Sequence, residues 1–380
     1  MRISFVVASA FLSVCFASSG GAQGALSLQG LGYPAGGLSA RAEGTGGGLA
    51  DFDALSTTSP AALAGVGSAA LFFQYSPEFR RVTTASGTAS TTTARFPIVE
   101  GVLPMGQSWT LGLSTSTFLD RSSETSLERV QVVGDPGDTV TLTERNKVLG
   151  AINDVRLGLA WSTSPVLRIG VGAHVFSGSN RVTFSQLFPD SAEFISSAQA
   201  GRISYAGFAA SLGIEYHPSR TIGFALSGRK GGDLRAQSAD TAIGHATLPD
   251  HYSASVMFEG IPGVTISARA AHDNWSSLTP LSSTGIQAFD GWDTGGGIEA
   301  TGPRIMQRIV SVRVGARFRT LPFGLNGEKV TEKSFTAGFG APLTRDRASF
   351  DVAIQRATRT AGSDITERGF ILSVGLRVSP

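Results

Sequence analysis

The chain is poor in cysteine, in charged residues and in long apolar runs. Its one cysteine, Cys15, lies in an N-terminal apolar run, and charged residues make up 16% of the chain, against about 25% in ordinary soluble domains. Beyond that run, no stretch approaches the roughly 20 apolar residues of a membrane-spanning helix. These shortages exclude disulfides, a cysteine nucleophile and a cysteine metal site from the mature chain, and they argue against a helical membrane protein or an ordinary cytosolic enzyme.

Charge of one sign is also lacking. The 31 basic and 29 acidic residues leave a formal net charge of only +2, so no strong positive field is available to attract a nucleic acid. At the same time 41% of the residues are hydrophobic, which is too many for a disordered chain. We therefore expect a folded protein with no nucleic-acid partner.

The first residues are typical of a secretory signal peptide. Met1 and Arg2 precede an apolar run from Ile3 to Phe16, and small residues follow as far as Ala22. A short basic start, an apolar stretch and a small-residue cleavage site form the pattern of such a peptide. We expect residues 1–22 to be removed and the mature chain to be exported.

What the chain has in abundance is alternation at a period of two. In residues 307–320, apolar side chains at the even positions from 310 to 318 alternate with Ser, Gly and Arg at the odd positions, and residues 366–378 repeat the pattern. Such segments are 9 to 15 residues long, whereas strands of soluble sandwiches have about 5 to 6. Length and the small or charged second face predict strands of a transmembrane antiparallel β-barrel.

The pattern predicts about fourteen strands in an all-β fold. They are expected near residues 69–84, 89–103, 107–120, 150–163, 166–178, 202–216, 221–236, 248–259, 264–276, 290–301, 307–321, 331–341, 347–359 and 366–378. Tight turns near 104–107, 164–165, 217–220, 261–263, 302–306 and 342–346 alternate with long loops near 121–149, 179–201, 237–247 and 277–289. This asymmetry is typical of bacterial outer-membrane barrels, with the short turns in the periplasm.

Residues 23–67 depart from the strand pattern. This segment is rich in Gly, Ala and Ser, and two interpretations are open: a disordered leader, or a plug folded inside the lumen. Its glycine cluster does not form a nucleotide-binding loop, because no strand precedes it and no Gly-Lys-Ser/Thr follows. The predicted organisation is a signal peptide over 1–22, a plug over 23–67 and a barrel over 68–380.

Both ends of the mature chain resemble one family of outer-membrane transporters. The segments that carry the resemblance are Gly37–Ala42, Leu49–Leu55, Ser59–Ala64, Arg319–Phe323, Asn326–Glu328 and Phe335–Leu343. The first three resemble the plug signature of the FadL/TodX family, and the others are similar to the closing strands of its distant branches. One departure is the motif Ser59-Pro60-Ala61, where the family usually has Asn-Pro-Ala. A serine can still bond to the local backbone.

The resemblance implies a function. It implies energy-independent uptake of long-chain fatty acids or other hydrophobic compounds, past a plug and out through a gap in the barrel wall into the outer-membrane lipid. It also implies a barrel of fourteen strands, and we expect a monomer. In the family, a kink in an early strand opens the wall; here residues 108–120 contain Gly112, which marks either such a kink or a site of close packing.

Arginines on the non-lipid faces of the strands are candidate ligands for a carboxylate. These are Arg156, Arg168, Arg269, Arg313, Arg317 and Arg377. A guanidinium offers a planar fork that holds a carboxylate, and our hypothesis is that Arg313 or Arg317 holds an anionic head group. The alternative is that the arginines pair across the wall with luminal acids such as Asp154, Glu215, Glu299 and Asp351, because an unpaired buried charge is unfavourable.

Other functional classes have weaker support in the sequence. None of the histidines, at 174, 217, 245, 251 and 272, lies in a recognisable nucleophile motif, so we expect no enzyme, although a Ser-His site stays open as an alternative. No His-Glu-x-x-His or paired cysteine occurs, and no cofactor or metal is expected. A barrel that serves as a surface-protein shuttle or secretion accessory is the second candidate. It should expose an apolar patch outside the membrane, whereas a transporter should enclose an apolar pocket.

Overall fold

The computed structural model describes residues 26, 30–84, 87–132, 139–188, 195–282, 286–305, 308–325, 327–343, 347–362 and 365–380. The predicted signal peptide lies outside these residues. No helix in the part of the chain described is long and apolar enough to cross a membrane.

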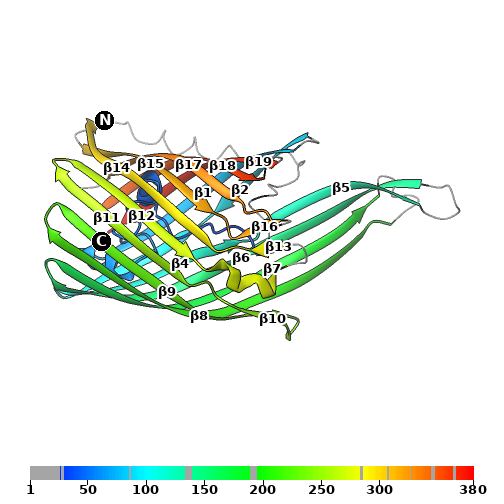
Figure 1. The fold of residues 1–380 in the computed structure, drawn as a ribbon, viewed down its shortest axis with the longest axis horizontal. Coiled ribbons are helices and arrows are strands. Elements are labelled where there is room, and N and C mark those ends of the chain that lie inside the picture. Colours follow the sequence, from blue (N-terminus) through cyan, green and yellow to red (C-terminus); the bar gives the residue numbers. More distant parts are fainter. Residues whose placement is uncertain are drawn as a thin grey trace, which may run out of the picture.

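Long antiparallel strands form the wall of a closed barrel (Figure 1). The strands are β1 Ala70–Thr84, β2 Gly87–Arg95, β3 Ile98–Met105, β4 Trp109–Asp120, β5 Ser123–Val132, β6 Thr139–Ser164, β7 Leu167–Leu187, β8 Ser197–Ser219, β9 Ile222–Ser238, β10 Thr241–Thr247, β11 His251–Ile261, β12 Val264–Asp273, β14 Gly291–Ile305, β15 Arg308–Thr320, β17 Thr331–Pro342, β18 Ala348–Ala361 and β19 Ile365–Val378. Two short strands, β13 Ile286–Ala288 and β16 Phe323–Leu325, pair with each other.

We call each passage of the chain from one end of the barrel to the other a crossing. Three crossings each consist of two shorter strands, one after the other. Both β2 and β3 pair with β1, both β4 and β5 pair with β6, and both β10 and β11 pair with β9. The barrel thus has fourteen crossings, and β19 closes it by pairing with β1. The fourteen-stranded barrel predicted from the alternation is confirmed.

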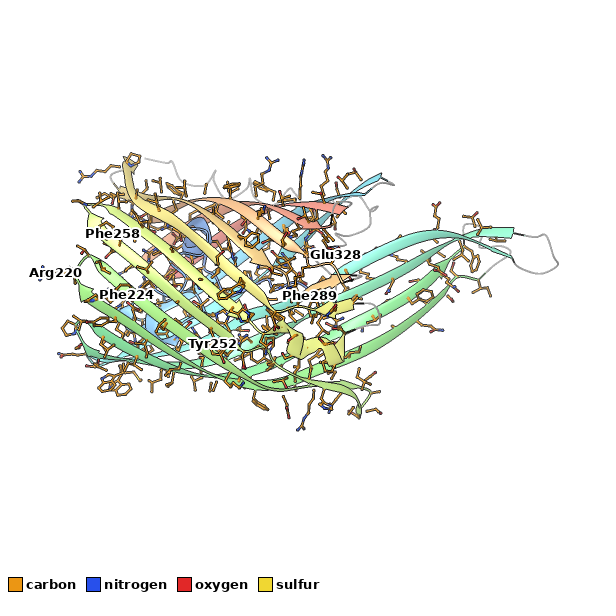
Figure 2. All side chains as sticks on the ribbon, viewed as in Figure 1. Arg220, Phe224, Tyr252, Phe258, Phe289 and Glu328 are labelled. Carbon is orange, nitrogen blue, oxygen red and sulfur yellow. The ribbon has the colours of Figure 1, made fainter. Side chains whose placement is uncertain are left out.

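The two faces of the wall differ as the alternation predicts. Apolar side chains such as Leu113, Leu157 and Leu226 point outward and are more than half exposed, which suits contact with lipid. Aromatic residues lie near one end of the outer face, where Trp109 stacks on Trp161 with their ring centroids 5.4 Å apart. Figure 2 shows Phe224 and Phe258 near the same end, with Arg220 beyond them. Aromatic residues at this position are typical of a membrane interface.

The two ends of the barrel are unlike each other. The tight turns after β3, β6, β8 and β11 lie at the end where the chain terminates, as predicted, and β14 and β17 end there too; we call this the turn end. At the opposite end β5 to β8 project far beyond the other strands (Figure 1). The long loops predicted over 121–149 and 179–201 are therefore wrong in large part: β6 begins at Thr139, β7 runs to Leu187, and β8 begins at Ser197.

The N-terminal segment, residues 30–67, lies inside the barrel. It contains one short helix, α1 Ala40–Gly44, which packs against β15, β17, β18 and β19, and one 3-10 helix, η1 Pro60–Gly65, which packs against β4, β6, β7 and β8. Most of its side chains are buried. Hydrogen bonds within the segment, such as that from the Thr57 N–H to the Gly37 carbonyl (2.8 Å), fold it back on itself.

Glycines on the inner wall give the two helices a surface to lie on. A Cβ atom at Gly170 would overlap the backbone between Pro60 and Ala61, and one at Gly158 would lie 2.7 Å from a methyl carbon of Leu63. Gly315 faces the backbone between Thr45 and Gly46 in the same way. Any side chain at these positions would push the segment off the wall.

We expect Gly170→Val to displace η1, because the valine side chain would occupy the space of the Pro60–Ala61 peptide unit. Limited proteolysis of the folded barrel should then cut residues 30–67 much faster than in the parent protein. Gly201→Val is the matched control, since nothing lies within 4 Å of a Cβ at Gly201. Equal rates of cleavage in both variants would contradict this packing.

Candidate functional site

The wall is interrupted between the second and third crossings. In the half near the turn end β3 pairs with β4, but among the described residues β2 pairs only with β1, and β5 only with β6. The chain turns away at Phe96 and Pro97, between β2 and β3. Across from this point β4 has a bulge at Phe118, between the pairs that Thr117 and Leu119 make with β6. The backbone edge of β4 is thus left without its strand partner near Asp120.

The N-terminal segment occupies this interruption. Tyr33 forms a two-residue antiparallel bridge with Asp120, in which the Tyr33 N–H donates to the Asp120 carbonyl (2.9 Å) and the Asp120 N–H donates to the Tyr33 carbonyl (2.8 Å). Gly36 lies against Thr117, where a Cβ would overlap the Thr117 carbonyl oxygen. The segment therefore takes the place on β4 that β2 vacates. An edge of unpaired backbone groups is satisfied in this way.

The Tyr33 side chain is held by four arginines. The guanidinium carbons of Arg80, Arg95, Arg319 and Arg359 lie 5.7, 5.0, 4.8 and 4.6 Å from the centroid of its ring. The Tyr33 hydroxyl accepts from Arg359 Nη2 (2.9 Å) and from Arg319 Nη2. We call these four arginines the Tyr33 cage. Cation–π contacts of this kind are worth about 0.5 to 2 kcal/mol each, and more when they are desolvated.

Carboxylates neutralise the cage. Glu78 contacts Arg80, Arg95 and Arg359, with N···O distances of 2.8, 2.5 and 2.7 Å. Glu332 and Glu367 pair with Arg359, each at 2.5 Å. The cage is thus a closed group of alternating charges, and Tyr33 is the part that comes from the N-terminal segment.

We expect Tyr33→Ala to loosen the segment from the interruption, because the variant loses the ring and the hydroxyl that four arginines contact. Purified protein in a planar lipid bilayer should show larger or more frequent ion-conducting openings than the parent. Tyr33→Phe, which keeps the ring, should lie between the two.

Tyr75→Ala is the control for this measurement. Tyr75 lies on the outer face, with its ring 5.0 Å from that of Phe96. Conductance that is the same for Tyr33→Ala and Tyr75→Ala would refute the anchoring role of the cage.

Two further ion pairs tie the segment to the opposite wall. The fully buried Asp51 carboxylate accepts from Ser255 (2.6 Å), Ser253 (2.8 Å) and Arg269 Nε (3.1 Å). Arg41 on α1 pairs with Glu299 on β14, with an Nη2 to Oε1 distance of 2.6 Å. The Asp51–Arg269 pair is buried, and removing one member of such a pair typically costs about 3 to 5 kcal/mol. The Arg41 side chain is partly exposed, so solvent weakens its pair with Glu299. These contacts make the segment an integral part of the lumen.

The Glu43 carboxyl makes the docking of α1 sensitive to pH. It borders a small cavity lined by Arg95, Arg317 and Arg319. Burial raises the pKa of Glu43 to about 7, although a hydrogen bond with Ser373 and the nearby arginines oppose the rise. A raised pKa means that the folded state binds the proton more tightly than the unfolded chain does, so stability falls as pH rises through this range and levels off above it.

We expect the parent barrel to lose thermal stability between about pH 4.5 and pH 7, the interval between the ordinary pKa of a glutamate and the raised pKa of Glu43. Glu43→Gln removes this titration and should make this part of the profile less steep. The unfolding temperature, followed by heat-modifiable migration on gels, measures it. The same slope in both proteins would contradict the assignment to Glu43.

An apolar cluster fills the lumen toward the projecting end. It joins residues from β4, β6, β7, β8, β9 and β10 with residues of β13, β16 and the 3-10 helix η2 Trp275–Leu281. The members are Leu31, Phe118, Leu119, Ile152, Phe176, Tyr205, Leu234, Ala236, Ala246, Leu248, Trp275, Leu278, Ala288 and Phe323. The rings of Phe118, Phe176 and Trp275 are in contact, with centroids 4.9 and 5.3 Å apart. We call this the apolar cluster.

A cavity of about 120 Å³ lies between part of the apolar cluster and part of the N-terminal segment. Phe118 and Trp275 border it on one side, and Leu38 of the segment on the other. Its remaining wall is polar and includes Arg317 and His174. The lumen thus changes from apolar to ionic along its axis.

The motif predicted in the plug lies in η1. Ser59 precedes the helix, Pro60 is its first residue, and all three residues of Ser59-Pro60-Ala61 are buried. The Ser59 side chain makes no hydrogen bond to the backbone of η1, and its hydroxyl oxygen faces Gly213 instead. The local turn bond expected of this serine is absent. Gly112 on β4 lies against Leu63, so it is a packing site, and the irregularity in that strand lies at Phe118.

Both candidate head-group arginines are ion-paired. Arg313 contacts Glu299 (2.5 Å) and Asp351 (2.6 Å), and Arg317 makes a two-pronged contact with Asp293 (2.7 and 2.5 Å). Arg168 pairs with Glu215, and Arg156 pairs with Glu100. The structure therefore pairs these arginines with carboxylates along the wall: Arg313 lies opposite Glu299 and Arg168 opposite Glu215 on neighbouring strands. Arg313 and Arg317 border different cavities.

Comparison with solved structures identifies the architecture. No family model and no curated protein matches the sequence. A FadL homologue of Pseudomonas aeruginosa matches with a TM-score of 0.62 over 90% of this chain and 98% of its own, at 14% identity. The monoaromatic hydrocarbon channel CymD matches at 0.58 with 12% identity, and the toluene transporter TbuX of Ralstonia pickettii at 0.51 with 13%, each with the same coverage. The chain has the FadL-like barrel fold.

Within this FadL-like barrel, sequence reasoning missed the residues around the interruption. Tyr33 lay in the predicted plug without a role, and its partners Arg80 and Arg359 were not assigned to the inner face. A signal did exist, because Arg80 and Glu78 are charged residues two apart in a strand, and so share a face. Phe118 could not have been found, since its bulge shifts it out of the alternation. Among the described residues, no group of acidic, histidine or cysteine side chains could hold a metal.

Proposed function

We propose that the protein is a bacterial outer-membrane transporter for passive uptake of hydrophobic compounds, with residues 23–67 as its plug and residues 68–380 as its barrel. The observation that carries the proposal is the apolar cluster above a sealed ionic lumen, beside an interrupted wall. A hydrophobic solute would meet Phe118, Phe176 and Trp275 first, and the charged lumen below offers it no favourable path. The interruption beside Phe118 is filled by the N-terminal segment at Tyr33 and Gly36, so in this proposal a displacement of that segment opens a route sideways into lipid.

The difference between the two ends of the barrel indicates its orientation in the membrane. The turn end carries the short turns, so it faces the periplasm in this proposal. The projecting strands β5 to β8 then face the outside. The proposal is supported by the similar solved structures, which include a monoaromatic hydrocarbon channel and a toluene transporter. Aromatic hydrocarbons and long-chain fatty acids are the candidate substrates, and the protein would act as a monomer.

We expect cells that carry the parent protein to take up radiolabelled toluene or oleate faster than cells with an empty vector. Trp275→Ala should slow uptake, because the tryptophan is buried in the apolar cluster where the solute would enter. Trp109→Ala is the matched control, since that ring lies on the outer face at the turn end. Uptake no faster than with the empty vector would refute the transport proposal.

The head-group role proposed for Arg313 and Arg317 needs a separate measurement. If either arginine holds a carboxylate, the double variant Arg313→Ala, Arg317→Ala should lose binding of oleate and keep binding of toluene, which has no charge to pair. If the double variant binds oleate and toluene as well as the parent does, the two arginines serve in ion pairs only and hold no head group. Toluene binding also reports whether the double variant still folds.

One observation favours the alternative, a surface-protein shuttle or secretion accessory. The projecting strands and the loop beside them expose Val130, Leu149, Phe184, Leu187 and Ile195, the last at 91%. Exposed apolar side chains on a sheet outside the membrane suit contact with another protein. By contrast, Ile286 of the predicted loop packs against the apolar cluster. If cells with the parent protein take up no hydrophobic compound, this alternative is favoured.

A further inference from the structure

Three polar side chains on neighbouring strands of the inner wall form a hydrogen-bonded chain. The His174 Nδ1 atom lies 2.9 and 3.0 Å from the two carboxylate oxygens of Asp154, and its Nε2 atom lies 2.8 Å from the Ser211 hydroxyl oxygen. Asp154 is on β6, His174 on β7 and Ser211 on β8. The order of contacts, carboxylate to imidazole to hydroxyl, is that of a serine nucleophile with its base and orienting acid.

Strand register produces this arrangement. Ser211 lies opposite Gly172, and Asp154 lies opposite Phe176, so His174 is diagonal to both. Because side chains two apart on a strand share a face, all three residues point into the lumen. A Cβ at Gly172 would collide with the Ser211 oxygen, and it would lie 3.3 Å from His174 Nε2. The missing side chain at Gly172 therefore makes room for the serine.

A buried arginine with unpaired N–H groups packs its aliphatic stem near Gly172. Arg156 is 1% exposed; its Nη2 donates to Glu100 (3.0 Å), but its Nε and Nη1 have no partner. The Arg156 Cδ lies 3.6 Å from the same Cβ position at Gly172. A buried guanidinium with unsatisfied N–H groups is an unfavourable arrangement in a resting structure, and it suits an oxygen that becomes negatively charged during a reaction.

All three residues are accessible from a cavity in the lumen. Ser211, His174 and Asp154 all line the 120 Å³ cavity beneath the apolar cluster, together with Phe118 and Trp275. The cavity thus places an apolar surface opposite a serine hydroxyl. A molecule that presents a carbonyl to Ser211 and a small apolar group to Phe118 fits this division.

We propose that Ser211, His174 and Asp154 form a catalytic triad that hydrolyses small hydrophobic carboxylic esters inside the lumen. The Ser211 oxygen attacks the ester carbonyl carbon as its proton passes to His174 Nε2, while Asp154 stabilises the imidazolium. The carbon–oxygen bond to the alcohol then breaks, and the alcohol leaves with the proton from His174. Water attacks the acyl-serine with His174 as base, which releases the carboxylic acid and restores the Ser211 hydroxyl.

The test uses the mature full-length protein purified in detergent, with two probes. Hydrolysis of p-nitrophenyl acetate measures turnover, and a fluorophosphonate, followed by peptide mass spectrometry, reports the modified serine. We expect modification at Ser211 and saturable hydrolysis by the parent. Ser211→Ala should abolish both, and His174→Ala should lower both about 100-fold, the usual contribution of a general base.

Two further variants separate catalysis from structure. Ser114→Ala is the matched control: Ser114 is a buried serine on β4 whose hydroxyl has no partner, and its loss should change neither readout. Gly172→Ala keeps all three triad residues but should reduce labelling by displacing the Ser211 oxygen. Heat-modifiable migration confirms that each barrel is folded. The proposal is overturned if the folded parent barrel is neither labelled at Ser211 nor faster in hydrolysis than Ser211→Ala. Asp154, His174 and Ser211 would then form a structural hydrogen-bond network only.

Discussion

The structure depends on ion pairing: every buried arginine on the inner wall needs a carboxylate partner. A guanidinium without a partner in an enclosed lumen is strongly unfavourable, and here the partners come from strands far apart in the sequence: Arg359 alone contacts Glu78, Glu332 and Glu367. The N-terminal segment joins the same network through Arg41 and Asp51. The position of the segment and the closure of the barrel are therefore mutually dependent.

This constraint divides the lumen into zones with different chemistry. Charged groups gather where the segment crosses the barrel, and the apolar side chains collect toward the projecting end in the cluster around Phe118 and Trp275. Between them lies a cavity with one apolar and one polar side. The interruption of the wall lies beside the apolar zone, at Phe118 on β4. A polar hydrogen-bonded chain at the boundary, Asp154 to His174 to Ser211, faces the same cavity.

Much of the fold could be predicted, and the failures have physical causes. Within the membrane, one face of each strand meets lipid and the other the lumen, so apolar and polar residues alternate and reveal the strand. Beyond the membrane, the projecting parts of β6 to β8 have no lipid on either face. Their alternation is weak, and residues 139–149 and 179–187 were predicted as loop although they form strand. The inward orientation of Arg313 and Arg317 was predictable for the same reason, as was pairing with Glu299 and Asp351.

The sequence by itself determined the barrel, its number of crossings, the turn end and the faces on which the arginines lie, because these follow from local periodicity and turn residues. Only the tertiary structure decided which residues meet. Tyr33 reaches Arg319 and Arg359 from about three hundred residues away, and the contact of His174 with Asp154 and Ser211 depends on the registers of β6, β7 and β8. Register and closure are properties of the whole sheet, since shifting one strand by a single residue would turn every side chain to the opposite face.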